Sequence, residues 1–333
     1  MKAFDRSIYT CAIAIALTLL FGFHAEAETW KVATKLPADS AEGKVVQRFA
    51  DLTELYSGGK LSINIYPSEQ LGREDAVLEQ LQGDVIQIYA ESSLFLQKWV
   101  PEIKWISAPF LFQDRESWAK FVAGPLAQGW YKMVEDQIGI VPLGDVTDVV
   151  RGPYRVIASR KPIEKVDDLN GLKLRMYPDE VANAIWTQLG LETTLLGWTE
   201  TYQSISSGVV DSVTAPIANI EAAKLYEVAP NIARTNEFWQ EIAFMMNKAA
   251  FEALSPELRQ ALLRAHAEAG KYSSEIMEKT ATDFLADEKK NKITFTQLDF
   301  DALKAKVSDW YRKQEAEGKL PTGFLEAVAA ASK

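Results

Sequence analysis

Cysteine is almost absent from this chain, whose 333 residues include only Cys11. A single cysteine forms no internal disulfide and cannot build a thiolate metal site. Histidine is nearly as rare, with only His24 and His266, which excludes a histidine-rich metal centre. We interpret His266 as an exposed helix residue rather than a catalytic base. The sequence also lacks GxSxG, Walker A and GxGxxG motifs, so it predicts neither an enzyme nor a resident cofactor.

Positive charge is in deficit, because 36 Lys and Arg residues stand against 46 Asp and Glu residues and the formal net charge is -10. No run rich in Lys or Arg offsets this balance, which disfavours a nucleic-acid partner. The other proportions, 47% hydrophobic and 25% charged, are those of a globular protein, and the length allows two domains.

A long apolar run is found only at the start of the chain, over residues 8–23. It follows a short positively charged segment and precedes Ala25-Glu26-Ala27, which fits a signal-peptide cleavage pattern. The alternative is a membrane anchor, but the run is short for a full span. We therefore predict a signal peptide over residues 1–27, which includes Cys11, and an exported, soluble chain that begins at Glu28.

Strand and helix patterns alternate along the rest of the chain. Apolar alternation predicts strands at residues 30–34, 61–65, 85–89, 140–146, 154–158, 172–176, 190–196, 209–214 and 241–247. Helical spacing predicts helices at residues 45–55, 73–82, 114–121, 180–189, 199–207, 255–292 and 300–315. Units of this length and order predict an α/β fold with mixed, mostly parallel sheets.

The helical pattern that begins at Ser255 continues to about Lys292 and is too long for a helix of one compact domain. It is suited to a helix that spans two lobes. The pattern also changes near Arg151-Gly152-Pro153, where we place a crossing between domains. We therefore predict one lobe from residues 28–152 plus about 241–280, and a second lobe from residues 153–240 plus about 281–333.

Arg175 is the first candidate for ligand binding, because it lies near the carboxyl end of the predicted strand 172–176. Ligands of open α/β sheets bind at that edge, and a guanidinium group offers a planar fork for a carboxylate. The alternative is a surface ion pair with Asp179 or Glu180. Arg155 lies on an earlier strand that could be adjacent, and two clustered arginines without acidic partners imply an anion. The alternative is that each arginine has its own carboxylate.

Other candidates lie at strand ends or in loops. Lys35 and Glu91 follow the first and third predicted strands, where both could face a crevice. They could equally be a solvated loop charge and a neighbour of a helix cap. Five aromatic residues could form a wall beside the carboxylate, or could simply pack in the core: Tyr177, Trp198, Tyr202, Phe238 and Trp239.

Several segments, taken in their order and spacing, resemble a known family. They are Gln70-Leu71-Gly72 after Ile65-Tyr66-Pro67, Pro109-Phe110-Leu111-Phe112, Asp168-Leu169-Asn170-Gly171-Leu172-Lys173-Leu174-Arg175, Gly208-Val209-Val210-Asp211, Tyr226-Glu227-Val228-Ala229-Pro230 and Leu254-Ser255-Pro256-Glu257. Together they resemble the periplasmic solute-binding proteins of tripartite ATP-independent periplasmic (TRAP) transporters, of the C4-dicarboxylate and sialic-acid receptor type. The resemblance covers nearly all of the chain after residue 27.

The resemblance implies a receptor in the periplasm that closes two lobes around an organic acid and delivers it to a small and a large membrane subunit. We expect it to act as a monomer without a cofactor. The family's anchoring arginine matches Arg175, and a second arginine matches Arg155. Its acid after the third strand matches Glu91, its early strand-end polar position matches Lys35, and Trp198 matches a position beside the pocket in ectoine-type receptors.

Two positions depart from the family pattern, and two other functions stay open. Ala215 replaces the usual asparagine that binds the ligand carboxylate, which Asn219 one turn later could replace. Glu237 stands where a histidine is common. The first alternative function is an exported hydrolase or lyase that uses carboxylates such as Glu91 and Asp211. The second is a receptor whose ligand is read by a sensor protein rather than imported.

Overall fold

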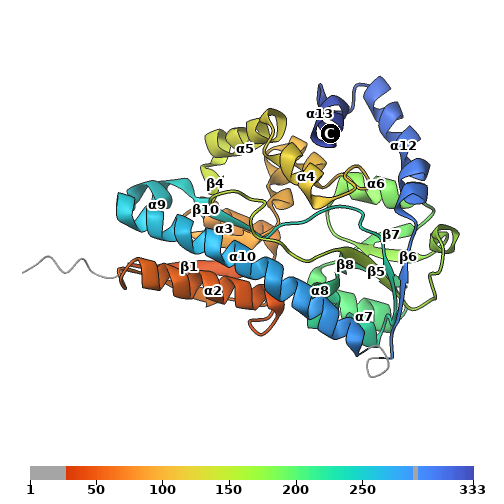
Figure 1. Ribbon diagram of the computed structural model, residues 1–333, viewed down its shortest axis with the longest axis horizontal. Coiled ribbons are helices and arrows are strands. Elements are labelled where there is room, and N and C mark those ends of the chain that lie inside the picture. Colours follow the sequence, from red (N-terminus) through yellow and green to blue (C-terminus); the bar gives the residue numbers. More distant parts are fainter. Residues whose placement is uncertain (1–27, 288–291) are drawn as a thin grey trace, which may run out of the picture.

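A computed structural model describes residues 28–287 and 292–333 of the chain. The predicted signal peptide, residues 1–27 with Cys11, lies outside the described residues. Within them, two β-sheets carry helices on their faces, and one long helix, α10 (Pro256–Ala286), runs past both (Figure 1). The predicted α/β fold, with mixed sheets and a helix that spans two lobes, is confirmed.

The first sheet has five strands in the order β2-β1-β3-β10-β4. Their bounds are β1 (Glu28–Thr34), β2 (Leu61–Tyr66), β3 (Ile88–Glu91), β4 (Ile140–Pro142) and β10 (Ala243–Asn247). Strand β1 is parallel to β2 and β3, whereas β10 runs antiparallel to β3 and β4. The carboxyl ends of β1 and β3 therefore meet at one edge, which carries Lys35 and Glu91.

The second sheet has six strands in the order β11-β9-β5-β8-β6-β7. Their bounds are β5 (Arg155–Ser159), β6 (Lys173–Met176), β7 (Glu192–Leu195), β8 (Ser212–Pro216), β9 (Asn231–Arg234) and β11 (Thr294–Gln297). Strand β6 is parallel to β7 and β8, and β5 is antiparallel to β8 and β9. Strand β8 thus separates the two strands that carry Arg155 and Arg175, which the sequence analysis had considered as neighbours.

Helices fill most of the connections between strands. They are α2 (Ala41–Tyr56), α3 (Glu74–Gln82), α4 (Arg115–Val122), α5 (Pro125–Ile138), α6 (Glu180–Gln188), α7 (Thr201–Ser206), α8 (Ile217–Ala222), α9 (Lys248–Ala253), α12 (Phe300–Ala316) and α13 (Phe324–Ala331). Short 3-10 turns include η1 (Ser93–Lys98), η2 (Pro101–Ser107) and η4 (Trp198–Glu200). Side-chain caps such as Ser40 on α2 and Asp179 on α6 fix where these helices begin.

Helix α10 joins the cores of the two sheets. It begins at a cap in which Ser255 Oγ accepts a hydrogen bond from the Leu258 N–H at 3.3 Å. Leu262 and Met277 pack in the core around the first sheet, whereas Ala281 lies in a core cluster with Val156 and Val213 of the second. The helix ends at Ala286, earlier than predicted, and residues 288–291 lie outside the described residues.

Two chain crossings lie side by side between the sheets. Val150 and Glu241 form an isolated antiparallel bridge, and the Arg151 N–H donates to the Gln240 carbonyl at 3.1 Å. The first crossing enters β5 and the second enters β10. This paired connection lies close to Arg151-Gly152-Pro153, where the sequence pattern changes.

Of the two C-terminal helices, α12 was predicted and α13 was not. The short strands β9 and β11 were not predicted either. The Phe324 ring of α13 packs against Trp105 of η2 at 5.2 Å and against Phe121 of α4 at 5.7 Å. Because η2 and α4 were assigned to the other lobe, the C-terminal segment contacts both sides of the predicted boundary, and the exact division stays a prediction.

His266 lies in the interior, so its prediction as an exposed helix residue was wrong. Its side chain is about 1% exposed and meets the Phe244 ring edge-on at 5.7 Å. Gly144 makes room for it, because a Cβ there would lie 2.8 Å from His266 Nδ1. Burial lowers the pKa of His266 from 6.5 to about 4. The imidazole is therefore neutral at pH 7.

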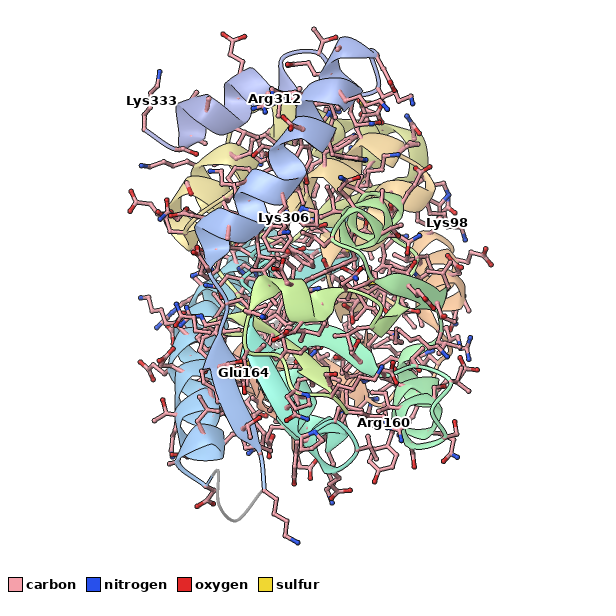
Figure 2. The ribbon with its side chains drawn as sticks, turned by 90° about the vertical axis from the view of Figure 1, so that its right-hand side faces the viewer. Lys98, Arg160, Glu164, Lys306, Arg312 and Lys333 are labelled. Carbon is pink, nitrogen blue, oxygen red and sulfur yellow. The ribbon has the colours of Figure 1, made fainter. Side chains whose placement is uncertain are left out.

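The outer surface is strongly charged. Figure 2 shows Lys306 and Arg312 of α12 on the outside of the molecule, and their side chains are 50% and 69% exposed. Across residues 28–287 and 292–333, no helix has both the length and the apolar character needed to cross a membrane.

Candidate ligand-binding site

A cavity of about 40 Å³ lies between the facing ends of the two sheets. The residues that line it are Lys35, Glu91, Leu94, Phe95, Arg151, Arg155, Arg175, Tyr177, Trp198, Thr214, Ala215, Pro216, Asn219 and Gln240. Seven of the ten residues named from the sequence are therefore brought together here. The other three, Tyr202, Phe238 and Trp239, lie outside the lining, and the Tyr202 hydroxyl donates to Glu227 at 2.9 Å.

Strand register explains why two arginines reach one cavity. Arg175, near the end of β6, is paired with Val213 of β8, and Arg155, at the start of β5, is opposite Pro216 at the end of β8. Because β5 runs antiparallel to β8, its first residue lies at the same edge as the last residues of β6 and β8. The edge that the sequence predicted thus carries both guanidinium groups.

Arg175 is buried without a charged partner. Its side chain is 4% exposed, and its Nε donates to the Leu196 carbonyl at 2.9 Å. The guanidinium carbon lies 5.5 Å from the Trp198 ring centroid. Within the described part of the chain, no carboxylate forms an ion pair with it and neither terminal nitrogen has a hydrogen-bond partner. Burial lowers its pKa from 12.5 to about 10.

The surface ion pair proposed as an alternative for Arg175 is not formed. Glu180 pairs instead with Lys104 at 2.7 Å. Asp179 caps α6 by accepting from the Ala182 N–H at 3.0 Å, and burial raises its pKa to about 6. A buried, unpaired guanidinium is costly, so a carboxylate entering the cavity would relieve that cost.

Arg155, in contrast, has its own carboxylate. Its Nε donates to Glu237 Oε1 at 2.7 Å, and its terminal nitrogens donate to Gln240 Oε1 at 2.5 Å and Thr214 Oγ1 at 3.3 Å. The Phe238 ring lies 4.1 Å from the guanidinium carbon. The proposed alternative, a local carboxylate for each arginine, therefore applies to Arg155 and not to Arg175. It also explains the place of Phe238, which covers Arg155 from behind the cavity.

A buried ion-pair network forms the wall next to the first sheet. Arg151 pairs with Glu42, at 3.0 Å between Nε and Oε2, and also with Glu91. Lys35 lies 3.7 Å from Glu91 Oε2 and pairs with Glu74. Burial alone would raise the pKa of Glu91, but the charges of Arg151 and Lys35 hold it at about 2. For Glu42, burial outweighs Arg151 and raises the pKa.

Four polar atoms of the lining residues are buried without a hydrogen-bond partner among the described residues. They are Glu91 Oε2, Arg151 Nε, the Tyr177 hydroxyl and Asn219 Oδ1, of which Arg151 Nε still forms an ion pair with Glu42. Asn219, on α8, is 6% exposed and stands beside Ala215, where the resemblance led us to expect an amide. Unpaired buried polar atoms are rare in folded proteins, and their convergence on one cavity is typical of a ligand site.

Sequence reasoning missed six of the lining residues, which are Leu94, Phe95, Arg151, Thr214, Pro216 and Gln240. The sequence analysis named Arg151 only as part of the crossing between domains. An arginine at a crossing between two lobes could have indicated a residue of the cavity between them. Trp239 is the opposite case, because its indole N–H donates to the Phe112 carbonyl at 3.3 Å and its ring packs on the core. A position near a strand end did not by itself show whether the side chain points into the cavity or into the core.

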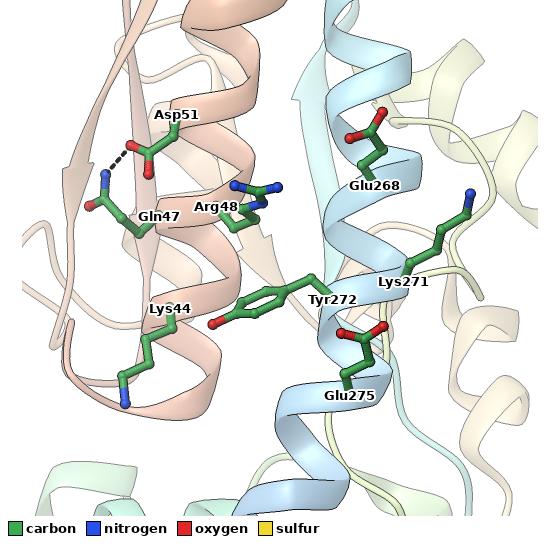
Figure 3. A pocket seen from close by; sticks show the side chains of 8 residues that line it. All are labelled: Lys44, Gln47, Arg48, Asp51, Glu268, Lys271, Tyr272 and Glu275. Carbon is green, nitrogen blue, oxygen red and sulfur yellow. Dashed lines mark hydrogen bonds between the residues drawn. The ribbon is translucent and has the colours of Figure 1, made fainter.

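A larger groove lies on the outside of the molecule, between α2 and α10 (Figure 3). It is lined by Lys44, Gln47, Arg48, Asp51, Glu268, Lys271, Tyr272 and Glu275. Most of these side chains are exposed to solvent, and Gln47 donates to Asp51 at 2.7 Å along its own helix. The groove therefore lacks the buried, unpaired groups that distinguish the cavity. Over the described ranges, no cluster of His, Cys, Asp and Glu side chains could hold a metal ion.

Two sheets joined by paired crossings, with a buried cationic cavity between them, define a two-lobed solute-binding protein. Residues 32–317 match the family described as bacterial extracellular solute-binding protein, family 7. The chain belongs to this family, as the resemblance predicted. It is a solute receptor of the TRAP-transporter type and not an enzyme.

Individual relatives support this assignment. An uncharacterized protein, y4mM, from Sinorhizobium fredii is 30% identical over 253 residues, which are 76% of this chain and 46% of that protein, so the chain spans about half of its length. The C4-dicarboxylate-binding periplasmic protein DctP of Rhodobacter capsulatus is 27% identical and is covered to 78%, with 80% of this chain aligned. The crystal structure of a sugar acid binding protein from Advenella mimigardefordensis in complex with galactonate superposes with a TM-score of 0.82 at 23% identity, covering 92% of this chain and 99% of that one.

Proposed function

We propose that this protein is a periplasmic receptor that binds a hydroxylated organic acid and delivers it, as a monomer, to the small and large membrane subunits of a TRAP transporter. The observation that carries the proposal is Arg175, a buried guanidinium group with two unpaired terminal nitrogens in the cavity. Such a group requires an anion to offset the cost of its burial. Membership of the family supports the location and the membrane subunits named in this proposal.

The ligand carboxylate is bound by the two terminal nitrogens of Arg175. A planar guanidinium fork matches the two oxygens of a carboxylate, and the bond from Nε to Leu196 fixes the plane of the fork. Trp198 limits its movement from one side. The rest of the ligand carries hydroxyl groups, which both donate and accept hydrogen bonds and so suit Tyr177, Asn219 and Glu91.

Closure of the two lobes buries the ligand. Three contacts bridge the cleft mouth: Arg73 with Glu200 at 3.1 Å, the Gln97 side chain with the Pro178 carbonyl at 2.9 Å, and Lys104 with Glu180 at 2.7 Å. The paired crossings at Val150 and Glu241 are the place where the lobes can rotate. A closed cleft excludes water and strengthens the ion pair at Arg175.

The hydrolase alternative receives no support from the site. Asp211 does not line the cavity and pairs with Lys161 at 3.0 Å, while Glu91 is bound by Arg151 and Lys35. The two carboxylates that the alternative required are therefore not placed together. The family also consists of receptors and not of enzymes.

Isothermal titration of organic acids into the refolded, ligand-free protein tests the proposal. Arg175→Ala should weaken binding on the order of 100- to 1,000-fold, because it removes one partner of a buried pair. Arg175→Lys should lose less affinity than Arg175→Ala, since lysine keeps the positive charge but not the planar guanidinium fork. Arg312→Ala, on an exposed arginine of α12, is the matched control and should bind like the wild type. Wild-type affinity in Arg175→Ala would overturn the proposal.

A further inference from the structure

The cationic side chains around the cavity each have at least one carboxylate partner, with a single exception. Four cationic side chains line it: Lys35, Arg151, Arg155 and Arg175. Glu74 and Glu91 pair with Lys35, Glu42 and Glu91 with Arg151, and Glu237 with Arg155. Among residues 28–287 and 292–333, Arg175 is the one lining cation that has no carboxylate.

Arg155 cannot act as a second free fork in this arrangement. Each of its three nitrogens is bound, to Glu237, Gln240 and Thr214, and Phe238 covers one face of the guanidinium group. Glu237 is itself fully buried, and its second oxygen accepts from the Thr235 hydroxyl. Turning Glu237 away would leave these donors unpaired in the interior.

A ligand with two negative charges would therefore be poorly matched. One carboxylate would occupy Arg175, and the other would lie near Glu91 Oε2, an acceptor without a hydrogen-bond donor. A second buried anion without a free cation is disfavoured both by desolvation and by repulsion from the ionised carboxylate. A hydroxyl group at the same place would instead donate to Glu91.

We propose that the cavity selects acids with a single negative charge, and that Glu237 sets this limit by neutralising Arg155. The inference rests on the proposed function and makes it more specific. Both ligand types occur among similar proteins, since one relative is named for dicarboxylates and a solved structure holds galactonate, a monocarboxylate. Glu237 is a specificity-determining residue that acts through Arg155 and does not itself line the cavity.

Matched pairs of acids test the limit in the wild-type protein. Threonate with tartrate, xylonate with xylarate, and galactonate with galactarate each differ only in a terminal CH₂OH or carboxylate. We expect every pair that binds to favour the monoacid by about 30-fold or more at pH 7. The monoamide of galactaric acid, which has the size of the diacid but one charge, should recover most of the affinity of galactonate.

The variant Glu237→Gln tests the assigned residue. It keeps one oxygen that can accept from Arg155 and Thr214, and it places an NH₂ group that can donate to the Thr235 hydroxyl. It removes the negative charge beside Arg155, so the preference for the monoacid should fall by about tenfold. Glu135→Gln is the control, because it also removes a carboxylate from an ion pair, with Lys248 at 2.7 Å, and Glu135 does not line the cavity. Its preference should equal that of the wild type.

The outcomes are distinguishable. If no acid of the panel binds, the proposed function fails and the charge limit falls with it. If acids bind but diacids bind as tightly as their monoacid partners, the proposed function stands and the charge limit is wrong. If Glu237→Gln folds and keeps the wild-type preference, Glu237 does not set the limit. Should that variant not fold, the wild-type panel with the monoamide still decides whether charge is the selected property.

Discussion

At the scale of single residues, the difference between Arg155 and Arg175 organises the site. Both are buried at the same sheet edge, 4% exposed in each case. Arg155 is held by Glu237, whereas Arg175 is bound by one backbone carbonyl. The two arginines thus differ in chemistry, because the charge of Arg155 is neutralised by Glu237 whereas Arg175 is free to bind an anion.

His266 gives a prediction about pH at this scale. Its folded pKa, about 4, lies below its unfolded value of 6.5, so the unfolded chain binds the proton more tightly. The neutral histidine is therefore tolerated fully above pH 6.5, and stability is lost as the pH falls from 6.5 towards 4. Between pH 7 and pH 5 the free energy of unfolding should fall by about 2 kcal/mol through this group.

Urea unfolding of the wild type and of His266→Gln at both pH values measures this effect. The difference between the two proteins isolates the histidine, because other groups titrate in both. Asp179, for example, acts in the opposite direction, since burial raises its pKa to about 6. An equal loss of stability in the two proteins would show that His266 does not contribute.

The position of Arg175 could be predicted from sequence, because a strand that ends before a helix places its last residues at the ligand edge. The partner of Arg155 could not, since Glu237 lies 82 positions further along the chain. Local patterns do not show which distant carboxylate meets a buried arginine. The same reason explains why Arg151, with partners at Glu42 and Glu91, was missed.

At the scale of elements, short edge strands and the C-terminal helix were the hardest to predict. Strands β9 and β11 have four residues each, and β11 is half-exposed, so neither shows a full apolar alternation. Helix α13 is mainly alanine and is held by Phe324 against aromatic rings of η2 and α4. These packing partners are remote in sequence, so the local pattern did not predict α13. Helix α10, in contrast, was predicted from its N-terminal cap and the length of its helical pattern.

The cleft mouth gives a prediction at the element scale. Arg73, before α3, pairs with Glu200 of η4, and both side chains are about half-exposed. Solvent screens such an exposed pair, so Arg73→Ala should weaken ligand binding no more than about fivefold. Calorimetric titration of the acid into wild type and Arg73→Ala, at low and high salt, measures this change in affinity. A loss comparable with that of Arg175→Ala would mean that the pair does more than hold the closed cleft.

At the scale of the whole molecule, two lobes share one long helix and two crossings. Two lobes were predicted from the long helical pattern after Ser255 and the pattern change near Arg151, and the ordered segments of the family implied the same fold, while the alternation of strands and helices predicted only an α/β protein. The pair between Arg73 and Glu200 joins the lobes at one place, and the bridge between Val150 and Glu241 lies in the crossings between them. Ligand binding and lobe closure are therefore expected to be coupled.

Small-angle scattering tests this coupling. The radius of gyration of the ligand-free protein should decrease when a saturating acid is added, because closure brings the two lobes together. Arg175→Ala at the same acid concentration should show no decrease. An unchanged radius in the wild type, with binding demonstrated in the same sample, would contradict closure by lobe rotation.

The most direct test of the central claim is a crystal structure of the protein with a bound monocarboxylate from the panel. The account predicts that both carboxylate oxygens lie within hydrogen-bonding distance of the terminal nitrogens of Arg175, while Arg155 keeps its bond to Glu237. A bound acid whose carboxylate lies elsewhere, with Arg175 still unpaired, would contradict it.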